Sequence, residues 1–233
     1  MVEVHQFRYG VDNLAYMISD AGDALVVDGG AAEEILRYAS AGPLRIRYVS
    51  NTHRHGDHTP GNDRILEQTG AAYLPPERFR ESERVPLGKD EVVVIRTPGH
   101  TRDSICFRTD RYLIGGDTLF NGTIGNCFSG DLDTYFATVK KLMALPPETV
   151  VYAGHDYVRD SIAFAKSLEP DSRYLNFFLQ QYDPNHVFST IADELRINPY
   201  FRFNEKPIVD FLRGKNLPCA TEEERWRSLM SIE

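Results

Sequence analysis

Residues 52–58 carry side chains that could bind metal ions: they read Thr-His-Arg-His-Gly-Asp-His, so three of the chain's seven histidines fall within six residues. Neutral imidazoles and carboxylates are ligands that zinc, manganese and iron take from proteins. His53 and His55 are two residues apart, so they point the same way in an extended segment. Gly56 then lets the chain turn before Asp57 and His58. The run therefore predicts two pairs of ligands aimed at two neighbouring points.

Three further candidate ligands each follow a segment that is typical of a strand. They are His100, Asp117 and His155, and each has a glycine immediately before it. Glycine allows another part of the backbone to approach closely. Functional groups gather at the strand ends of layered α/β folds, so we expect these side chains to join the ligands of residues 52–58.

Strands and helices that alternate along the chain must position these ligands. Segments with strand composition end before each candidate ligand, and turn residues separate them. The predicted strands are residues 2–9, 13–19, 24–27, 45–50, 71–74, 91–96, 104–108, 112–114 and 149–152. The predicted helices among them are residues 31–41 and about 62–69. Alternation of this kind predicts an α/β class, with sheets covered by helices.

The last third of the chain is predicted to be a small helical appendage without a strand. Thr221 and Glu224 have the spacing of a capping box at the start of its final helix. The helices are expected at residues 158–168, 172–182, 189–194, 207–213 and 221–230.

Composition excludes several classes of function. The net charge is −8, with 26 basic and 34 acidic residues, and a chain with no basic excess is not expected to bind nucleic acid. The chain begins with no signal-like segment and has no run of eighteen apolar residues, so we expect a cytoplasmic protein that does not enter membranes. Cys106, Cys127 and Cys219 are odd in number and far apart, which suggests neither disulfides nor a cysteine metal site. Nothing in the sequence indicates an oligomeric state.

The ordered ligand pattern resembles the metallo-β-lactamase superfamily, through most of residues 1–165. The resemblance implies an αββα sandwich over residues 1–165, with a two-metal site at one edge, and a helical C-terminal domain over residues 166–233 that binds substrate. It also implies that one metal is held by His53, His55 and His100. Asp57, His58 and His155 would hold the other, and Asp117 would bridge the two.

Two divalent metals about 3.5–4 Å apart can hold a water molecule, lower its pKa and polarise a carbonyl or phosphoryl oxygen. We therefore expect hydrolysis by a hydroxide between the metals, with Asp57 and Asp117 as the catalytic carboxylates. Because the hydroxide is the nucleophile, no serine or cysteine nucleophile is needed. The sequence accordingly has no nucleophile elbow, and it has no P-loop. We expect zinc, although the same ligands also suit iron and manganese.

The C-terminal part resembles glyoxalase II, the hydroxyacylglutathione hydrolases. This resemblance implies cleavage of a small-molecule thioester, S-2-hydroxyacylglutathione or a related acyl-thiol, to a 2-hydroxy acid and a thiol. It places Tyr157, Arg202 and Lys206 where the family has substrate-contacting tyrosine and basic residues. The similar segments are residues 116–120, 145–149, 154–157, 163–170, 189–194 and 198–200.

One loop departs from the glyoxalase II pattern. Residues 124–130 read Ile-Gly-Asn-Cys-Phe-Ser-Gly, so Asn126 replaces a basic residue and Phe128 stands where a tyrosine would offer a hydroxyl. Losing a charge-assisted hydrogen bond costs about 1.5–3 kcal/mol, or one to two decades of affinity. A thiol other than glutathione is therefore an alternative. Cys127 is either a small apolar filler or a candidate for substrate contact or redox sensitivity.

Two rival interpretations remain. Persulfide dioxygenases have a similar ligand motif and use one iron, which His53, His100 and Asp117 would bind here. The longer helical tail and the Asp-Thr-Leu-Phe run of residues 117–120 favour the hydrolase. A phosphodiesterase or nuclease is the third alternative, and the acidic balance of the chain counts against it.

Overall fold

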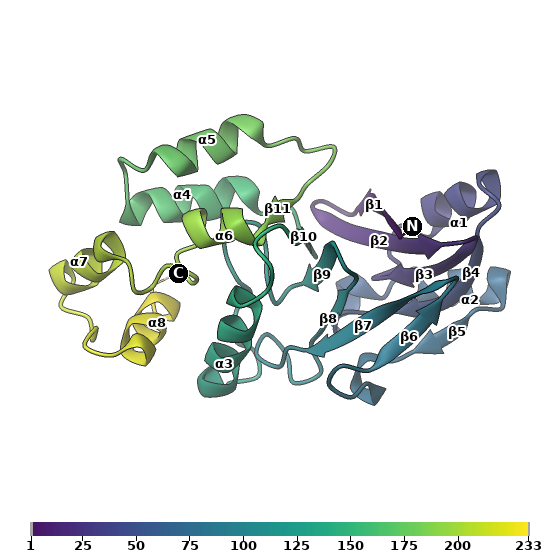
Figure 1. The fold of residues 1–233 in the computed structure, drawn as a ribbon, viewed down its shortest axis with the longest axis horizontal. Coiled ribbons are helices and arrows are strands. Elements are labelled where there is room, and N and C mark those ends of the chain that lie inside the picture. Colours follow the sequence, from purple (N-terminus) through teal and green to yellow (C-terminus); the bar gives the residue numbers. More distant parts are fainter. Residues whose placement is uncertain (1, 233) are drawn as a thin grey trace.

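Two β-sheets lie face to face between layers of helices, which confirms the predicted αββα arrangement (Figure 1). The structure, a computed structural model, describes residues 2–232. Among these residues, no helix is long and apolar enough to cross a membrane.

The first sheet has the strand order β1-β2-β3-β4-β5, antiparallel from β1 to β3 and parallel from β3 to β5. Both faces of β2 are buried, because Tyr16 packs between the sheets and Met17 packs under the outer helices. The strands are β1 (Glu3–Tyr9), β2 (Asn13–Asp20), β3 (Asp23–Val27), β4 (Arg45–Ser50) and β5 (Ala72–Leu74). The outer helices are α1 (Ala32–Ala41) and α2 (Asn62–Thr69).

The second sheet has the order β11-β10-β9-β8-β7-β6. Its inner face adds Val94 and Phe107 to the core between the sheets, and its outer face packs against Tyr135 and Val139 of α3. The strands are β6 (Arg84–Leu87), β7 (Asp90–Arg96), β8 (Ile105–Arg108), β9 (Tyr112–Gly116), β10 (Val150–Ala153) and β11 (Ser189–Thr190). Helix α3 spans Leu132–Met143.

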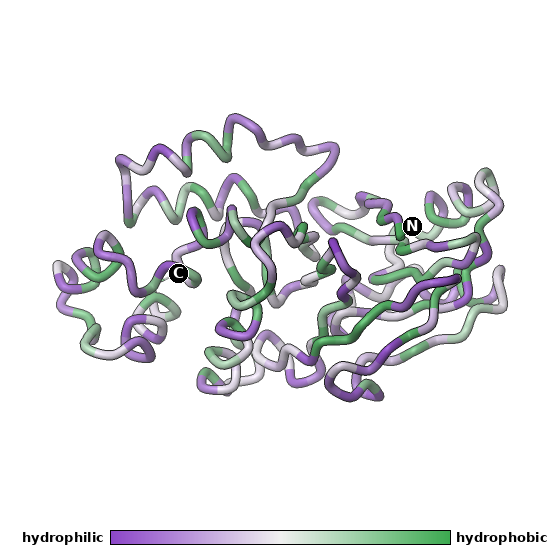
Figure 2. The backbone as a smooth tube through the Cα atoms, viewed as in Figure 1, coloured by the Kyte–Doolittle hydropathy of each residue, from purple (hydrophilic) through white to green (hydrophobic). Residues whose placement is uncertain are grey.

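The C-terminal residues form helices, as predicted. Along α4 and α5 the hydropathy changes from turn to turn, as expected for helices with one buried face (Figure 2). The predicted capping box of Thr221 and Glu224 is present at α8. The helices are α4 (Val158–Leu168), α5 (Arg173–Gln181), α6 (Ile191–Ile197), α7 (Lys206–Gly214) and α8 (Glu222–Met230).

The prediction of no strand in this region was wrong. Ser189 and Thr190 pair with Val151 and Val150 of β10, and α6 begins only after them. A strand of two residues is too short for a pattern of alternating side chains, so only its tertiary partner defines it. The predicted domain boundary at 165/166 lies inside α4, and the boundary itself stays a prediction.

Candidate metal centre

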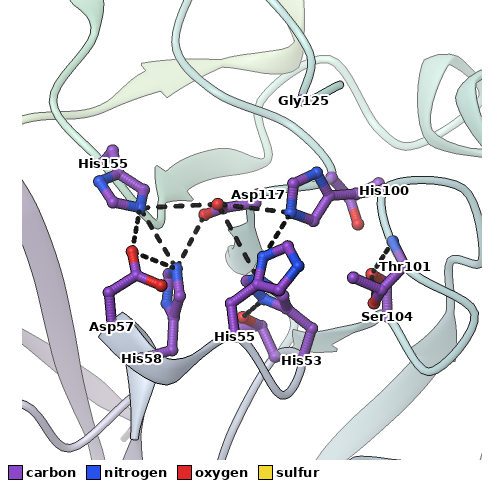
Figure 3. Close-up of polar contacts among 12 residues, drawn as sticks. His53, His55, Asp57, His58, His100, Thr101, Ser104, Asp117, Gly125 and His155 are labelled. Carbon is purple, nitrogen blue, oxygen red and sulfur yellow. Dashed lines mark hydrogen bonds and ion pairs between the residues drawn. The ribbon is translucent and has the colours of Figure 1, made fainter. Parts of the chain in front are cut away.

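Strand ends from both sheets bring the predicted ligands to one place (Figure 3). Residues 52–58 follow β4, and His100 follows β7. β9 and β10 run parallel with Gly116 opposite Ala153, so Asp117 and His155 lie just beyond adjacent strand ends. The sequence-based prediction that these segments meet is therefore what the structure shows.

The first group of ligands surrounds a single point. His55 Nδ1 lies 2.8 Å from His53 Nε2 and 3.1 Å from His100 Nε2. Asp117 Oδ2 lies 3.9 and 3.6 Å from the Nε2 atoms of His53 and His100. Tetrahedral zinc with bonds of about 2.0–2.1 Å separates its ligand atoms by about 3.3 Å, so the spacing of these atoms fits one cation.

The second group surrounds a neighbouring point. His58 Nε2 and His155 Nε2 are 3.2 Å apart, and Asp57 Oδ2 lies 3.7 and 3.3 Å from them. Asp117 reaches this group as well, with Oδ1 3.3 Å from His58 Nε2. Within residues 2–232, Asp117 Oδ1 is a buried atom that accepts no hydrogen bond, as expected of an atom whose partner is a cation. Asp117 thus lies where a bridging ligand would lie, and its assignment as the bridge stays a prediction.

The electrostatics of the cluster favour cation binding. Burial lowers the pKa of His53 to about 4, so its imidazole is neutral and free to ligate. Burial would raise the pKa of Asp117, but His58 and the other imidazoles hold it well below its usual range. Burial likewise opposes the protonation of His58, whereas Asp28 and Asp117 raise its pKa to about 11. These two carboxylates thus favour a positive charge beside His58, which a metal cation would supply in place of the proton.

Acceptors outside the cluster orient the histidine rings. The Nδ1 atom of His100 lies 2.9 Å from the carbonyl oxygen of Asn126, and that of His155 lies 2.9 Å from Asp12 Oδ1. Such contacts place the proton on Nδ1 and direct Nε2 toward a metal. Asp12 was not found by sequence reasoning, because it lies 143 residues from His155 and belongs to the turn between β1 and β2.

Asp28 is a second residue that sequence reasoning missed. It follows β3, is fully buried, and has a left-handed backbone with φ 56°. Its carboxylate accepts hydrogen bonds from the backbone N and the Oγ1 of Thr52, both at 2.8 Å, and lies 3.1 Å from His58 Nδ1. Asp28 therefore holds Thr52, at the start of residues 52–58, and the imidazole ring of His58.

We expect Asp28→Asn to weaken metal binding by about 10–100-fold, the usual effect of removing a partner of a ligating histidine. Asparagine tolerates left-handed backbone, so the substitution removes the charge without strain. Metal affinity would be measured by competition with a chelator. Asp23→Asn, at the opposite end of β3, is the matched control and should bind metal as the wild type does. Equal affinities for the wild type and the Asp28 variant would contradict this role.

The first hairpin also touches the second group of ligands. Asn13 donates to Asp57 Oδ2 at 3.1 Å, and the hydroxyl of Tyr9 donates to the backbone oxygen of Asp57 at 2.8 Å. The only sequence signal for this contact was a pair of polar residues, 12 and 13, where a turn meets the start of a strand. The hairpin thus holds the most exposed of the seven ligands in place.

Three of the predicted substrate residues lie beside the cluster. The ring of Phe128 meets the rings of His55 and His100 edge-on, at 5.5 and 5.2 Å, and is 66% exposed. The ring of Tyr157 stacks on His155 at 4.9 Å. Asn126 holds His100 through its carbonyl oxygen, and its side chain is exposed.

The other two predicted substrate residues are engaged elsewhere. Arg202 is buried, and its guanidinium donates to Glu169 at 2.7 Å and to Glu205 at 2.6 Å. Lys206 pairs with Asp210 on the exposed side of α7. Because both cations already have carboxylate partners, these contacts give no support to the prediction that they bind substrate.

Comparisons with known proteins agree with this geometry. A family model described as "Metallo-beta-lactamase superfamily" matches residues 8–78 and 74–155, and a "Hydroxyacylglutathione hydrolase C-terminus" model matches residues 156–229. The chain is 35% identical to a hydroxyacylglutathione hydrolase of Nitrosococcus oceani, over 86% of this chain and 85% of the relative. It is 31% identical to one of Idiomarina loihiensis, over 89% of each chain.

Solved structures share the fold. ETHE1 from Myxococcus xanthus has a TM-score of 0.72 at 21% identity, covering 99% of this chain and 90% of its own. TTHA1623, solved in a di-iron-bound form, has a TM-score of 0.63 at 21% identity, covering 84% of this chain and 99% of its own.

Proposed function

We propose that the seven clustered side chains hold two divalent cations. The premise is that the chain belongs to the hydroxyacylglutathione hydrolases of the metallo-β-lactamase superfamily. It is therefore a metal-dependent thioester hydrolase. The observation that carries this proposal is that Asp117 lies within reach of both groups of ligands. The proposed sets are His53, His55 and His100 for one cation, Asp57, His58 and His155 for the other, with Asp117 shared.

The cations, when bound, would polarise the thioester carbonyl and lower the pKa of water. The residues of the chain orient the reactants. Asp57 is held by Asn13 and faces the centre. Burial and the Asp12 carboxylate raise the pKa of Tyr157 to about 12, so its phenol stays protonated and can donate a hydrogen bond to substrate.

Zinc is the cation that we propose. The donor set has five imidazoles and two carboxylates, with no thiolate, which suits zinc and is also compatible with iron and manganese. Residues 166–233 would contribute to the binding of the thiol part of the substrate, and the predicted boundary between the two domains belongs to this proposal.

We propose that the thiol is not glutathione, or that glutathione binds only weakly. The reason is that the loop beside His100 has Asn126 in place of a cation. We expect Asn126→Lys to lower KM for S-lactoylglutathione by about 10–100-fold, the value of one charge-assisted hydrogen bond. The substitution keeps the backbone oxygen that holds His100. A thioester with no carboxylate on its thiol is the control and should show no change, whereas equal changes for both substrates would contradict the interpretation.

A mononuclear iron persulfide dioxygenase is the second candidate. It would leave Asp57, His58 and His155 without a cation, although their ligand atoms converge within 4.8 Å. Oxygen consumption with glutathione persulfide distinguishes the two functions. The proposal predicts thioester hydrolysis without oxygen uptake, and rapid oxygen uptake in place of hydrolysis would favour the alternative.

A further inference from the structure

A buried carboxylate outside the metal centre lies in the C-terminal helices. Glu194 of α6 is fully buried, and its oxygens accept hydrogen bonds from Ser189 Oγ at 2.6 Å, Asn198 Nδ2 at 2.8 Å and the backbone N of Gly122 at 3.1 Å. Within residues 2–232 the groups that act on its charge are hydrogen-bond donors and the carboxylate of Asp193, with no cation among them. A charge buried in this way is costly, so a compensating role is expected.

The donor at Gly122 belongs to a loop, residues 118–126, that begins next to Asp117. Gly122 lies at its tip with φ 99°, and a bridge between Leu119 and Ile124 closes the tip. Asn198 also donates to the carbonyl oxygen of Thr123 at 3.1 Å. Helix α6 thus holds the tip through Glu194 and through the residue at its C-terminal end.

The base of the same loop carries parts of the metal centre. Asp117 precedes the loop, and the carbonyl oxygen of Asn126 orients His100 at 2.9 Å. The hydroxyl of Tyr135 bonds to the carbonyl oxygens of Thr118 and Gly125, at 3.1 and 2.9 Å, so the two sides of the base are tied together. The tip held by α6 and the base beside two candidate ligands thus belong to one tied loop.

We propose that Glu194 is a positioning residue for thioester hydrolysis. It acts through residues 118–126 to keep the side chains of Asp117 and His100 in the positions that metal binding requires. The inference rests on the proposed two-metal centre. It makes the centre depend on docking of α6, which lies in the C-terminal part of the chain.

The charge of Glu194 fits this role. Its surroundings are three hydrogen-bond donors, which match the acceptors of an ionised carboxylate. Burial, and to a smaller extent the carboxylate of Asp193, raise its pKa to about 7, whereas the hydrogen bonds from Ser189, Asn198 and Gly122 favour the ionised form. The carboxylate of Asp193 is itself used within α6, where it accepts from the backbone N and Oγ1 of Thr190.

The test compares Glu194→Gln with Asp193→Asn, a change in the neighbouring residue that weakens the helix cap but does not touch the loop. For Glu194→Gln we expect kcat to fall by about tenfold or more with KM unchanged, because the backbone N–H of Gly122 lies 3.1 Å from both carboxylate oxygens and would face the amide Nε2 whichever way the side chain lies. The visible spectrum of the cobalt-substituted enzyme should change with it. Asp193→Asn should lower the melting temperature and leave kcat and the spectrum as in the wild type.

Ser189→Ala removes one donor to Glu194 and one acceptor of Asn121 Nδ2 in the same loop, and serves if the glutamine variant fails to fold. It should change kcat and the cobalt spectrum in the same direction but less. Wild-type kcat and spectrum in Glu194→Gln or in Ser189→Ala would overturn the inference. Losses of kcat in Asp193→Asn as large as those in Glu194→Gln would also overturn it. A wild type that binds fewer than two metals would instead count against the proposed function.

Discussion

Replacing Asp117 with alanine is expected to lower kcat for thioester hydrolysis by about a thousandfold or more, because it removes a side chain that lies within reach of both groups of ligands. The bound metal should fall at the same time. Steady-state kinetics and metal analysis of the same preparation measure both effects.

Asp110→Ala is the matched control for this change. Asp110 is exposed in the turn that precedes β9, the strand that ends beside Asp117. Its replacement should leave both kcat and metal content at wild-type values. Near-normal hydrolysis by the Asp117 variant would count heavily against a shared carboxylate.

Replacing Gly154 with alanine should have the second-largest effect, although it adds only a methyl group. A Cβ at this position would lie 2.2 Å from Asp117 Oδ1 and 2.9 Å from His58 Cε1, and neither side chain can retreat within the packed cluster. We expect loss of metal and of at least about 99% of activity, a change of roughly 2.7 kcal/mol in the barrier. Metal analysis and kinetics again provide the measurement.

Gly214→Ala is the control for the glycine variant. Gly214 ends α7, and a Cβ there meets nothing within 4 Å. That variant should be active and bind metal normally. An active Gly154→Ala enzyme with its full complement of metal would show that the contact between β10 and Asp117 is looser than the structure indicates.

The convergence of the candidate ligands could be predicted from sequence because their signals are local. Residues 52–58 are contiguous, and each downstream ligand follows both a strand pattern and a glycine. Strand ends in layered folds meet at one edge, so order along the chain was sufficient to bring His100 and His155 to residues 52–58.

The residues that support the ligands could not be found in this way. Asp12 and Asp28 lie in ordinary turn and strand-end segments, and only the pairing of distant strands brings them to His155 and His58. Arg202 illustrates the converse case. The resemblance to glyoxalase II placed it among the residues that contact substrate, but its guanidinium pairs with Glu169, 33 residues away, so its part in substrate binding stays a prediction.

Besides β11, two elements were missed for similar reasons. Helix α3 was not predicted, although Asp131 caps it and Lys140 and Lys141 lie in its last turn. β6 contains Pro86 and forms the edge of its sheet, where a residue without an N–H is tolerated. Neither carries a ligand, so the prediction of the site did not depend on them.

The central claim is that one chain holds two cations that together support thioester hydrolysis. The most direct test measures metal per chain and S-lactoylglutathione hydrolysis on a single purified sample, before and after chelation. The account predicts close to two divalent ions, activity that is lost with them, and recovery when zinc is restored. One ion per chain with full hydrolytic activity would contradict it.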